Sequence, residues 1–383
     1  MKIMFYLGHP AHFNLFRHVI QSMQENHHSV IILCRKKDVL LDLLNHAGWN
    51  HYNILPRGRK NNKFALVTSF MAKFIRMLMI SLKIRPDLLI GTSEVIPYIG
   101  KLLKKPSIIV NEDDAEAVPY FSRLSYPLAT HIIAPAGVSV GKWSHKHIGY
   151  NGYHELAYLH PKYFRPNALV LKKYNLSRPF HIIRLARLNA HHDNDNRGIS
   201  DSIVFELLKL FGTENQILIS SERPVDKSLH PLLFKIDAHD MHHLLYFAQL
   251  YIGDSQTMAA EAAILGTPSI RFNHFVGKLY YLKELEEKYG LSIGIPDSDP
   301  QKLYTTVRFL IKQQPGLKRI WQQRAQRMIR EKDDVTEFFL QKITMIYNDS
   351  VGTPTVPSFD SRPKYEKESP VPSLQFYYAE NKE

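Results

Sequence analysis

Residues 251–270, YIGDSQTMAAEAAILGTPSI, combine an apolar strand, a polar turn and a helix rich in small residues. Asp254 or Ser255 can cap this helix, and the free N–H groups of its first turn, at the positive end of the helix dipole, form a binding site for a diphosphate. Glu261 follows two turns into the helix. Its side chain leans back towards the helix start, where its carboxylate can accept hydrogen bonds from ribose hydroxyls. The competing interpretation is an ordinary capped helix with Glu261 in water.

Histidine and carboxylate side chains follow the strands expected in the first half of the chain. The segment Gly8-His9-Pro10-Ala11-His12 comes directly after the first apolar run. A neutral imidazole titrates near working pH, so His12 is predicted to act as a general base that takes a proton from an attacking hydroxyl. Glu94 and Glu112 follow two other strands and are the next candidate bases. Capping of the following helices is the competing interpretation for all of these side chains.

A second polar cluster follows the strand expected at 181–186. Arg184 and Arg187 flank the end of this strand, and planar guanidinium groups suit the bidentate binding of phosphate. The next segment carries His191, His192, Asp193 and Asp195. These four could suggest a metal site, but adjacent residues seldom face one ion, so we predict that no metal is bound. Solvated loop polarity is the competing interpretation, above all for Asp195.

Short apolar runs provide the scaffold for these side chains. In the first half they cover 2–7, 29–34, 87–91, 107–111 and 131–135, and in the second half 181–186, 216–221, 250–255 and 268–272. Helical or loop segments of crossover length separate them, which predicts parallel sheets covered on both faces. Two such series predict an α/β protein of two doubly wound, Rossmann-like domains with a cleft between them, and a single barrel is the weaker alternative. The expected boundaries are 1–160 for the first domain, 161–348 for the second and 349–383 for a flexible, Pro- and charge-rich tail.

The composition limits the compartment and the partners. With 44% apolar and 22% charged residues, the chain of 383 residues can bury two cores. Its one cysteine, Cys34, excludes an internal disulfide framework and any metal site of several cysteines. The amino-terminal residues lack an apolar export signal, so a cytoplasmic location is expected. The net charge of +13 favours anionic partners such as nucleotide diphosphates or an acidic membrane surface.

Much of the positive charge lies in residues 57–85, where eight basic residues and no acidic one occur. Lys73, Arg76 and Lys83 fall on one narrow face of an otherwise apolar helix, which is too interrupted by charge for a transmembrane span. The default interpretation is a helix packed on the sheet with its charges in water. The alternative is a peripheral patch that binds anionic lipid at the inner face of the plasma membrane. No nucleic-acid-binding motif accompanies the charge, so nucleic acid is not an expected partner.

The turn and helix at 251–270, with the preceding DMHHLLYFAQLYIGDS from Asp240, resemble the second domain of GT-B glycosyltransferases and of UDP-N-acetylglucosamine 2-epimerases. The shared pattern is a strand, a Ser/Gly turn, a glutamate and then Gly-x-Pro. The resemblance implies that Glu261 binds the ribose and that the backbone near Ile236 meets the base. It assigns the pyrophosphate to the turn residues Ser255, Gln256 and Thr257.

Residues 1 to about 345 are more closely similar to an uncharacterised bacterial and archaeal family with this GT-B-like fold, catalogued as a domain of unknown function. The matching segments are GHPAHFNLF (8–16), RLARLNAHHD (184–193) and GDSQTMAAEAAILGTPSIRFN (253–273). The chain departs from the epimerases at 91–94, where GTSE replaces Gly-Asp-Thr, and at 112–114, where EDD replaces Glu-Ala-Gly. It also has no acidic residue between 120 and 128, where the epimerases carry one.

These patterns favour a metal-independent sugar transferase that uses a UDP-type nucleotide sugar as its substrate and needs no further cofactor. The expected acceptor is a glycan or a lipid-linked precursor, in the synthesis of cell-surface polysaccharide or glycolipid. The alternative enzyme is a UDP-sugar 2-epimerase, which could be a hydrolysing one. The alternative outside the enzymes is a non-catalytic protein that binds nucleotide sugars.

Overall fold

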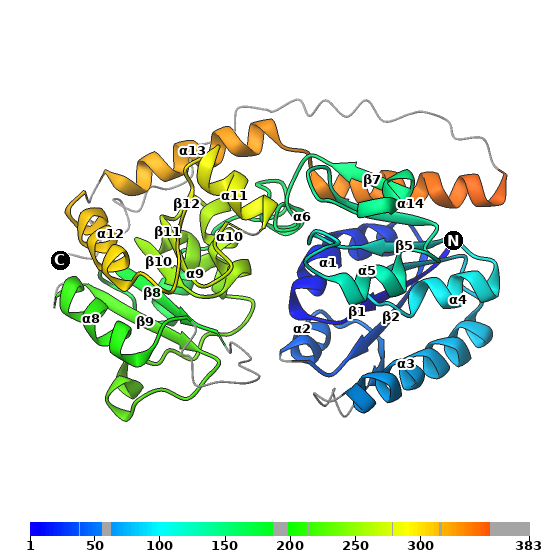
Figure 1. Ribbon diagram of the computed structural model, residues 1–383, viewed down its shortest axis with the longest axis horizontal. Helices are drawn as coiled ribbons and strands as arrows, with labels where there is room; N and C mark the ends of the chain where they lie inside the picture. The colour runs from blue at the N-terminus through cyan, green and yellow to red at the C-terminus, as the bar shows by residue number, and fades with distance from the viewer. Residues whose placement is uncertain are drawn as a thin grey trace. The chain divides into compact units, whose positions relative to one another are not determined.

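The computed structural model describes residues 1–37, 39–55, 63–186, 198–212, 215–277, 279–313 and 316–352, which form two compact units (Figure 1). The first unit comprises Met1–Phe164 together with the described residues from Glu331 to Gly352. The second unit comprises Arg165–Arg330. Each unit is built around its own parallel sheet. No helix of the described chain has the length and apolar character that a membrane crossing requires.

Within the described residues, the sheet of the first unit has seven strands in the order β3-β2-β1-β4-β5-β6-β7, and every neighbouring pair is parallel. The strands are β1 (Lys2–Leu7), β2 (Ser29–Arg35), β3 (His51–Leu55), β4 (Leu88–Gly91), β5 (Ser107–Val110), β6 (His131–Pro135) and β7 (His147–Tyr150). The strand order reverses between β1 and β4. The carboxyl ends of these two strands therefore form the switch point at which open α/β sheets bind ligands.

Helices cover both faces of the first sheet. They are α1 (Pro10–Glu25), α2 (Leu40–His46), α3 (Lys63–Ile84), α4 (Ile96–Leu103), α5 (Pro119–Ser125), η1 (Gly141–Lys146), α6 (Leu156–Leu159) and α14 (Val335–Val351). Met4 and Tyr6 of β1 are buried in a core that includes Met77 of α3. Phe5 packs against Phe16 of α1, with ring centroids 5.4 Å apart. Because both faces of β1 are covered, its residues from Ile3 to Leu7 are all apolar and do not alternate with polar ones.

Helix α14 belongs to the first unit, although the sequence places residues 161–348 in the second domain. Phe339 of α14 packs edge-on against Phe16 of α1 at a centroid distance of 5.7 Å. Thr336 Oγ1 donates a hydrogen bond of 2.7 Å to the Ala157 carbonyl. The expected boundary at 348 is therefore wrong for this helix. Helical periodicity shows that a helix has a buried face, but it does not show which core that face packs against. Of the expected tail, residues 353–383 lie outside the described residues.

The second unit contains, among its described residues, a five-stranded parallel sheet of order β12-β11-β10-β8-β9. Its strands are β8 (Phe180–Leu185), β9 (Gln216–Ser221), β10 (Leu250–Gly253), β11 (Ser269–Phe272) and β12 (Ser292–Ile295). Its helices are α7 (Leu169–Lys173), α8 (Asp201–Phe211), η2 (Lys227–Leu232), α9 (Met241–Phe247), α10 (Gln256–Ile264), α11 (Tyr280–Glu287), α12 (Pro300–Lys312) and α13 (Leu317–Glu331). The strand order reverses between β8 and β10. Two Rossmann-like units, as predicted, are thus confirmed.

Candidate active site

His12 stands in the first turn of α1, directly after β1. Its Nδ1 accepts a hydrogen bond of 3.1 Å from the Gly8 N–H and lies 2.7 Å from Thr92 Oγ1, which follows β4. Burial lowers the pKa of His12 well below 6.5, and nearby positive charges, first that of His9, act in the same direction. Because Nδ1 accepts a backbone N–H, the neutral ring carries its proton on Nε2. His12 is therefore a hydrogen-bond donor at Nε2, which does not fit the role of general base expected from the sequence.

Gly91 allows β4 to approach β1 closely enough for this contact. Its φ is +150°, and a Cβ at this position would lie 2.5 Å from the Tyr6 carbonyl oxygen. Any other residue would have to displace the backbone of β1. The glycine therefore helps to place Thr92 beside His12.

Glu94 lies in the loop after β4 and forms an ion pair with Lys73 of α3. Burial alone would raise the pKa of Glu94, but the charge and the hydrogen bond of Lys73 bring it below its ordinary value. The Lys73 side chain is only 10% exposed, so the expectation that it lies in water is wrong. A carboxylate held as a lysine counter-ion is a weak proton acceptor, and Glu94 is accordingly a poor candidate for the base.

Glu112, which follows β5, is paired with a histidine that was not among the predicted site residues. His154 lies in the loop between β7 and α6, and its Nδ1 is 3.0 Å from Glu112 Oε2. Tyr150, the last residue of β7, stacks on the His154 ring with centroids 6.2 Å apart and planes 18° apart. Burial alone would raise the pKa of Glu112, but the charge and hydrogen bond of His154 lower it further than burial raises it. Glu112 is thus an ionised acceptor for His154.

Asp113 titrates in the opposite direction from its neighbour. Burial, followed by the charge of Glu112, raises the pKa of Asp113 to about 6. Adjacent carboxyl groups whose pKa values are pushed apart are typical of sites that handle protons. The carboxyl ends of β1, β4, β5 and β7 therefore assemble one group of polar residues in the first unit, namely His12, Thr92, Glu112, Asp113 and His154.

In the second unit, Ser255 caps α10. Its Oγ accepts a hydrogen bond of 3.4 Å from the Met258 N–H, which confirms one of the two caps proposed from the sequence. Gln256 and Thr257 occupy the first turn of the helix and are half-buried. The remaining N–H groups of this turn lie at the carboxyl edge of the sheet, beside the switch point between β8 and β10.

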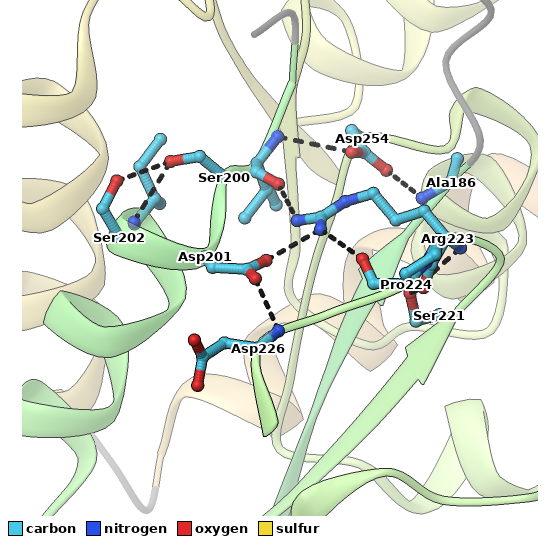
Figure 2. Close-up of polar contacts among 11 residues, drawn as sticks. Ala186, Ser200, Asp201, Ser202, Ser221, Arg223, Pro224, Asp226 and Asp254 are labelled. Atoms are coloured by element: carbon cyan, nitrogen blue, oxygen red, sulfur yellow. Dashed lines mark hydrogen bonds and ion pairs between the residues drawn. The ribbon is translucent and has the colours of Figure 1, made fainter. Parts of the chain in front are cut away.

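Asp254 does not cap α10 but forms a clamp, in that its carboxylate binds the backbone at two separate points of the chain. Its Oδ1 accepts a hydrogen bond of 2.6 Å from the Ala186 N–H and its Oδ2 one of 3.3 Å from the Ile199 N–H (Figure 2). Burial raises the pKa of Asp254 to about 6, although these N–H groups act against the rise. Arg223 completes the clamp by donating to the Ile199 carbonyl at 2.7 Å and to Asp201 Oδ1 at 2.7 Å. Together they fix the residues on either side of 187–197.

Glu261 is buried in the middle of α10, so the alternative of an exposed glutamate is wrong. Its Oε1 lies 3.0 Å from His242 Nε2, and the two side chains are only 6% and 8% exposed. His242 comes from α9 and was not among the predicted site residues. Its signal in the sequence is the polar pair at 242–243 inside an otherwise apolar helix. A buried carboxylate in the helix that follows this turn remains compatible with the ribose binding expected from the sequence.

Of the two arginines predicted to bind the diphosphate, Arg184 and Arg187, the structure describes only Arg184. Arg184 of β8 forms an ion pair with Glu222 and donates a hydrogen bond of 2.5 Å to Ser220 Oγ. Its charge is thus already balanced by a carboxylate, which weakens the expectation that it binds a diphosphate. Arg187 lies outside the described residues, and so do the four polar residues considered for a metal, His191, His192, Asp193 and Asp195.

Two further features of the second unit concern ligand binding. Ile236 is half-buried in the irregular segment between η2 and α9, two residues after Phe234, whose N–H donates a hydrogen bond of 2.8 Å to the Ile219 carbonyl of β9. Among the described residues, Asp237, His239 and Asp240 form a group with the spacing of metal ligands. The Lys173 ammonium lies 2.6 Å from the Asp237 carboxylate and 2.5 Å from that of Asp240. A lysine therefore occupies the position that a cation would take.

Comparisons with known proteins agree with this architecture. A family model described as "Protein of unknown function (DUF354)" matches residues 1–348. No curated protein matches the sequence.

Several solved structures share the fold. MnaA of S. aureus in complex with UDP aligns with a TM-score of 0.64 at 15% identity over 92% of this chain and 99% of that one. The UDP-GlcNAc 2-epimerase of Neisseria meningitidis, bound to UDP-GlcNAc, aligns with a TM-score of 0.63 at 13% identity over 90% and 100%. The spinosyn rhamnosyltransferase SpnG, complexed with the spinosyn aglycone, aligns with a TM-score of 0.57 at 14% identity over 89% and 100%. These likenesses establish a GT-B-like fold.

Proposed function

The chain belongs to the family described as "Protein of unknown function (DUF354)" and has a GT-B-like fold, and from this premise we propose that it is a metal-independent glycosyltransferase with a UDP-type donor. One observation carries the proposal. In the second unit, a serine-capped helix starts at the carboxyl edge of the sheet, where this architecture binds ligands, and the same helix carries the buried Glu261. The MnaA structure with UDP and the epimerase structure with UDP-GlcNAc support the donor class.

Each part of the donor has a proposed partner. The pyrophosphate meets the first turn of α10, at Ser255, Gln256 and Thr257, because free N–H groups and the helix dipole both favour an anion there. The ribose hydroxyls donate to Glu261, and the base lies along the backbone near Ile236. The acceptor is a hydroxyl of a glycan or of a lipid-linked sugar, and its proposed partners are the polar residues at the carboxyl ends of the strands in the first unit.

Replacement of Glu261 tests this donor site. Glu261→Ala should weaken UDP binding by about 1.5 to 3 kcal/mol, roughly 10- to 150-fold, the usual value for hydrogen bonds to a charged group. Glu261→Gln keeps an oxygen for His242 and should lose less. Glu287→Ala removes a carboxylate that is 69% exposed on α11 and serves as the matched control. Calorimetry that shows unchanged UDP affinity in a folded Glu261→Ala variant would refute the ribose assignment.

A UDP-sugar 2-epimerase is the second candidate, favoured by the opposed pKa shifts of Glu112 and Asp113. An epimerase must remove and return a proton at sugar C2, so it exchanges that proton with solvent deuterium. A transferase leaves the C2 proton in place and releases UDP in step with an acceptor. A protein that binds UDP-sugars but neither exchanges nor releases them is the non-catalytic alternative.

We further propose that α3 brings the enzyme to the inner face of an anionic membrane. The exposed side of this helix carries a row of apolar residues three or four apart, namely Val67, Met71, Ile75, Met79 and Leu82. Arg76, Lys83 and Arg85 are exposed beside the row. An apolar stripe flanked by cations suits the boundary between headgroups and acyl chains of anionic lipid. Two copies of such a cationic face would repel each other, which favours lipid over a second copy of the chain.

A further inference from the structure

The hydrogen bonds of three histidines at the carboxyl edge of the first sheet differ in a way that assigns their roles. His9 Nδ1 accepts a hydrogen bond of 3.2 Å from the Ala11 N–H, and His12 Nδ1 accepts one of 3.1 Å from the Gly8 N–H. A ring nitrogen that accepts a backbone N–H carries no proton, so each neutral ring is protonated at Nε2. At Nε2, both His9 and His12 can only donate.

His154 has the opposite arrangement. Its Nδ1 lies 3.0 Å from Glu112 Oε2. The carboxylate is ionised and cannot donate, so Nδ1–H is the donor, and in the neutral ring the lone pair lies on Nε2. This Nε2 is shielded from solvent and has no hydrogen-bond partner among the described residues. A buried acceptor that the described residues leave without a partner is available to a ligand proton.

We infer that His154, oriented by Glu112, is the catalytic base of this enzyme, and that His12 beside it is a hydrogen-bond donor to the substrate. The inference rests on the proposed function. It places Glu112 as a positioning residue that holds the tautomer and faces the charge formed on the ring, as a carboxylate does for a catalytic histidine in other hydrolytic and transfer enzymes.

The reaction balances with the donor and acceptor already named. The acceptor hydroxyl gives its proton to His154 Nε2 while its oxygen forms a bond to the anomeric carbon. The bond from that carbon to the diphosphate oxygen breaks, and UDP leaves with the electron pair. The imidazolium is then stabilised by the Glu112 carboxylate 3.0 Å away and returns its proton to water after the products leave.

A substrate-free measurement tests the geometry. In a protein with ¹⁵N-labelled histidine, two-bond nitrogen–proton correlation spectra distinguish the two neutral tautomers. His154 should show the Nδ1–H form and His12 the Nε2–H form, with each signal assigned by its loss in His154→Gln or His12→Gln. An Nε2–H tautomer at His154 would overturn the inference.

Turnover tests the role. UDP release from UDP-GlcNAc and UDP-glucose is measured with sugar or lipid-linked hydroxyl acceptors, alongside UDP binding by calorimetry. His154→Gln should bind UDP as the wild type does but turn over about 100- to 10,000-fold more slowly. His145→Gln, the same change at an exposed histidine of η1, should have no effect. A folded His154→Gln variant with wild-type turnover would remove His154 from the mechanism.

Glu112 is distinguished from a merely structural residue by its pattern of rescue. Glu112→Gln should lower kcat with little change in KM, and Glu112→Asp should restore part of kcat because it again supplies a carboxylate to Nδ1. Equal losses in both variants would exclude the positioning role. A wild-type protein that neither binds UDP nor releases it from any UDP-sugar refutes the proposed function itself, whereas binding and turnover that survive His154→Gln refute only this inference.

Discussion

Acidification should destabilise the second unit through one buried histidine on its interior strand β8. His181 has no exposed surface and stacks on Phe211 of α8, with ring centroids 4.3 Å apart. Burial lowers the pKa of His181 from 6.5 to about 4 in the folded protein. Its protonation is therefore far easier in the unfolded chain than in the native state.

The sign and size of the effect follow from linkage. The unfolded state takes up the proton first as the pH falls, so the stability contribution of a neutral His181 is complete above pH 6.5 and is lost towards pH 4. With pKa values of 6.5 in the unfolded chain and about 4 in the folded protein, the free energy of unfolding falls by about 2 kcal/mol at pH 5. Well below pH 4 the fall reaches its limit of about 3 kcal/mol. Asp254 acts in the opposite direction, because its raised pKa stabilises the folded state as the pH falls below about 6. The contribution of His181 must therefore be isolated with a variant.

His181→Leu provides this comparison, since leucine has a similar volume and no titratable group. The free energies of unfolding of wild type and His181→Leu are measured by urea denaturation, followed by circular dichroism, at pH 8 and at pH 5. Between pH 8 and pH 5, the free energy of unfolding of the variant should rise by about 2 kcal/mol relative to that of the wild type. His230→Leu, at an exposed histidine of η2, should show no such gain. A wild-type-to-variant difference that is the same at both pH values would refute the reasoning.

Three further changes probe other parts of the chain. Ile75→Glu should reduce partition onto phosphatidylglycerol vesicles at low salt about tenfold or more, since it removes an apolar contact with the lipid and adds repulsion from the anionic headgroups. An unchanged partition, or a wild-type dimer by light scattering that Ile75→Glu dissociates, would show that lipid is not the partner. Gly91→Ala should lower the free energy of unfolding by more than about 1 kcal/mol, because its Cβ would lie 2.5 Å from the Tyr6 carbonyl oxygen, and equal urea midpoints would contradict this. Ser255→Ala should lower the free energy of unfolding by about 1 kcal/mol through loss of the α10 cap, whereas Ser255→Asn, which can still cap the helix, should not. Equal losses in the two variants would show that the cap is unimportant.

The sequence predicts every interior strand of the two described sheets but only one of their four edge strands, β9. The apolar runs correspond to β1, β2, β4, β5 and β6 in the first unit and to β8, β9, β10 and β11 in the second. The strands without a predicted counterpart are β3, β7 and β12, and all three lie at the edge of a sheet. An edge strand packs against fewer neighbours and can keep polar residues, as β7 does with His147. Apolar continuity therefore detects the interior strands, and it detects an edge strand only where that strand is itself apolar, as β9 is at Ile217, Leu218 and Ile219.

The candidate site was predictable where one local segment forms it. The strand, turn and helix at 251–270 contain Ser255 and its partner Met258 within four residues, so the cap follows from local sequence. The pairing of Glu112 with His154 joins residues that follow two different strands, one of them the unpredicted β7. Periodicity likewise placed Lys73 on a face of α3 but could not reveal a carboxylate partner in the loop after β4.

The role of an imidazole depends on which ring nitrogen the fold already uses, and residue type carries no information on this. The motif after β1 contains His9 and His12 at positions that look suited to a base, but the backbone N–H groups of the tight strand-to-helix turn bind both Nδ1 atoms. A histidine just after a strand and before a helix is prone to this arrangement, because the N–H groups of that turn lack helical partners and seek an acceptor. His154 follows an edge strand and meets a carboxylate through Nδ1, which keeps Nε2 available for a proton. A base in such a fold is therefore better sought among histidines bound to a carboxylate than among those nearest the first strand.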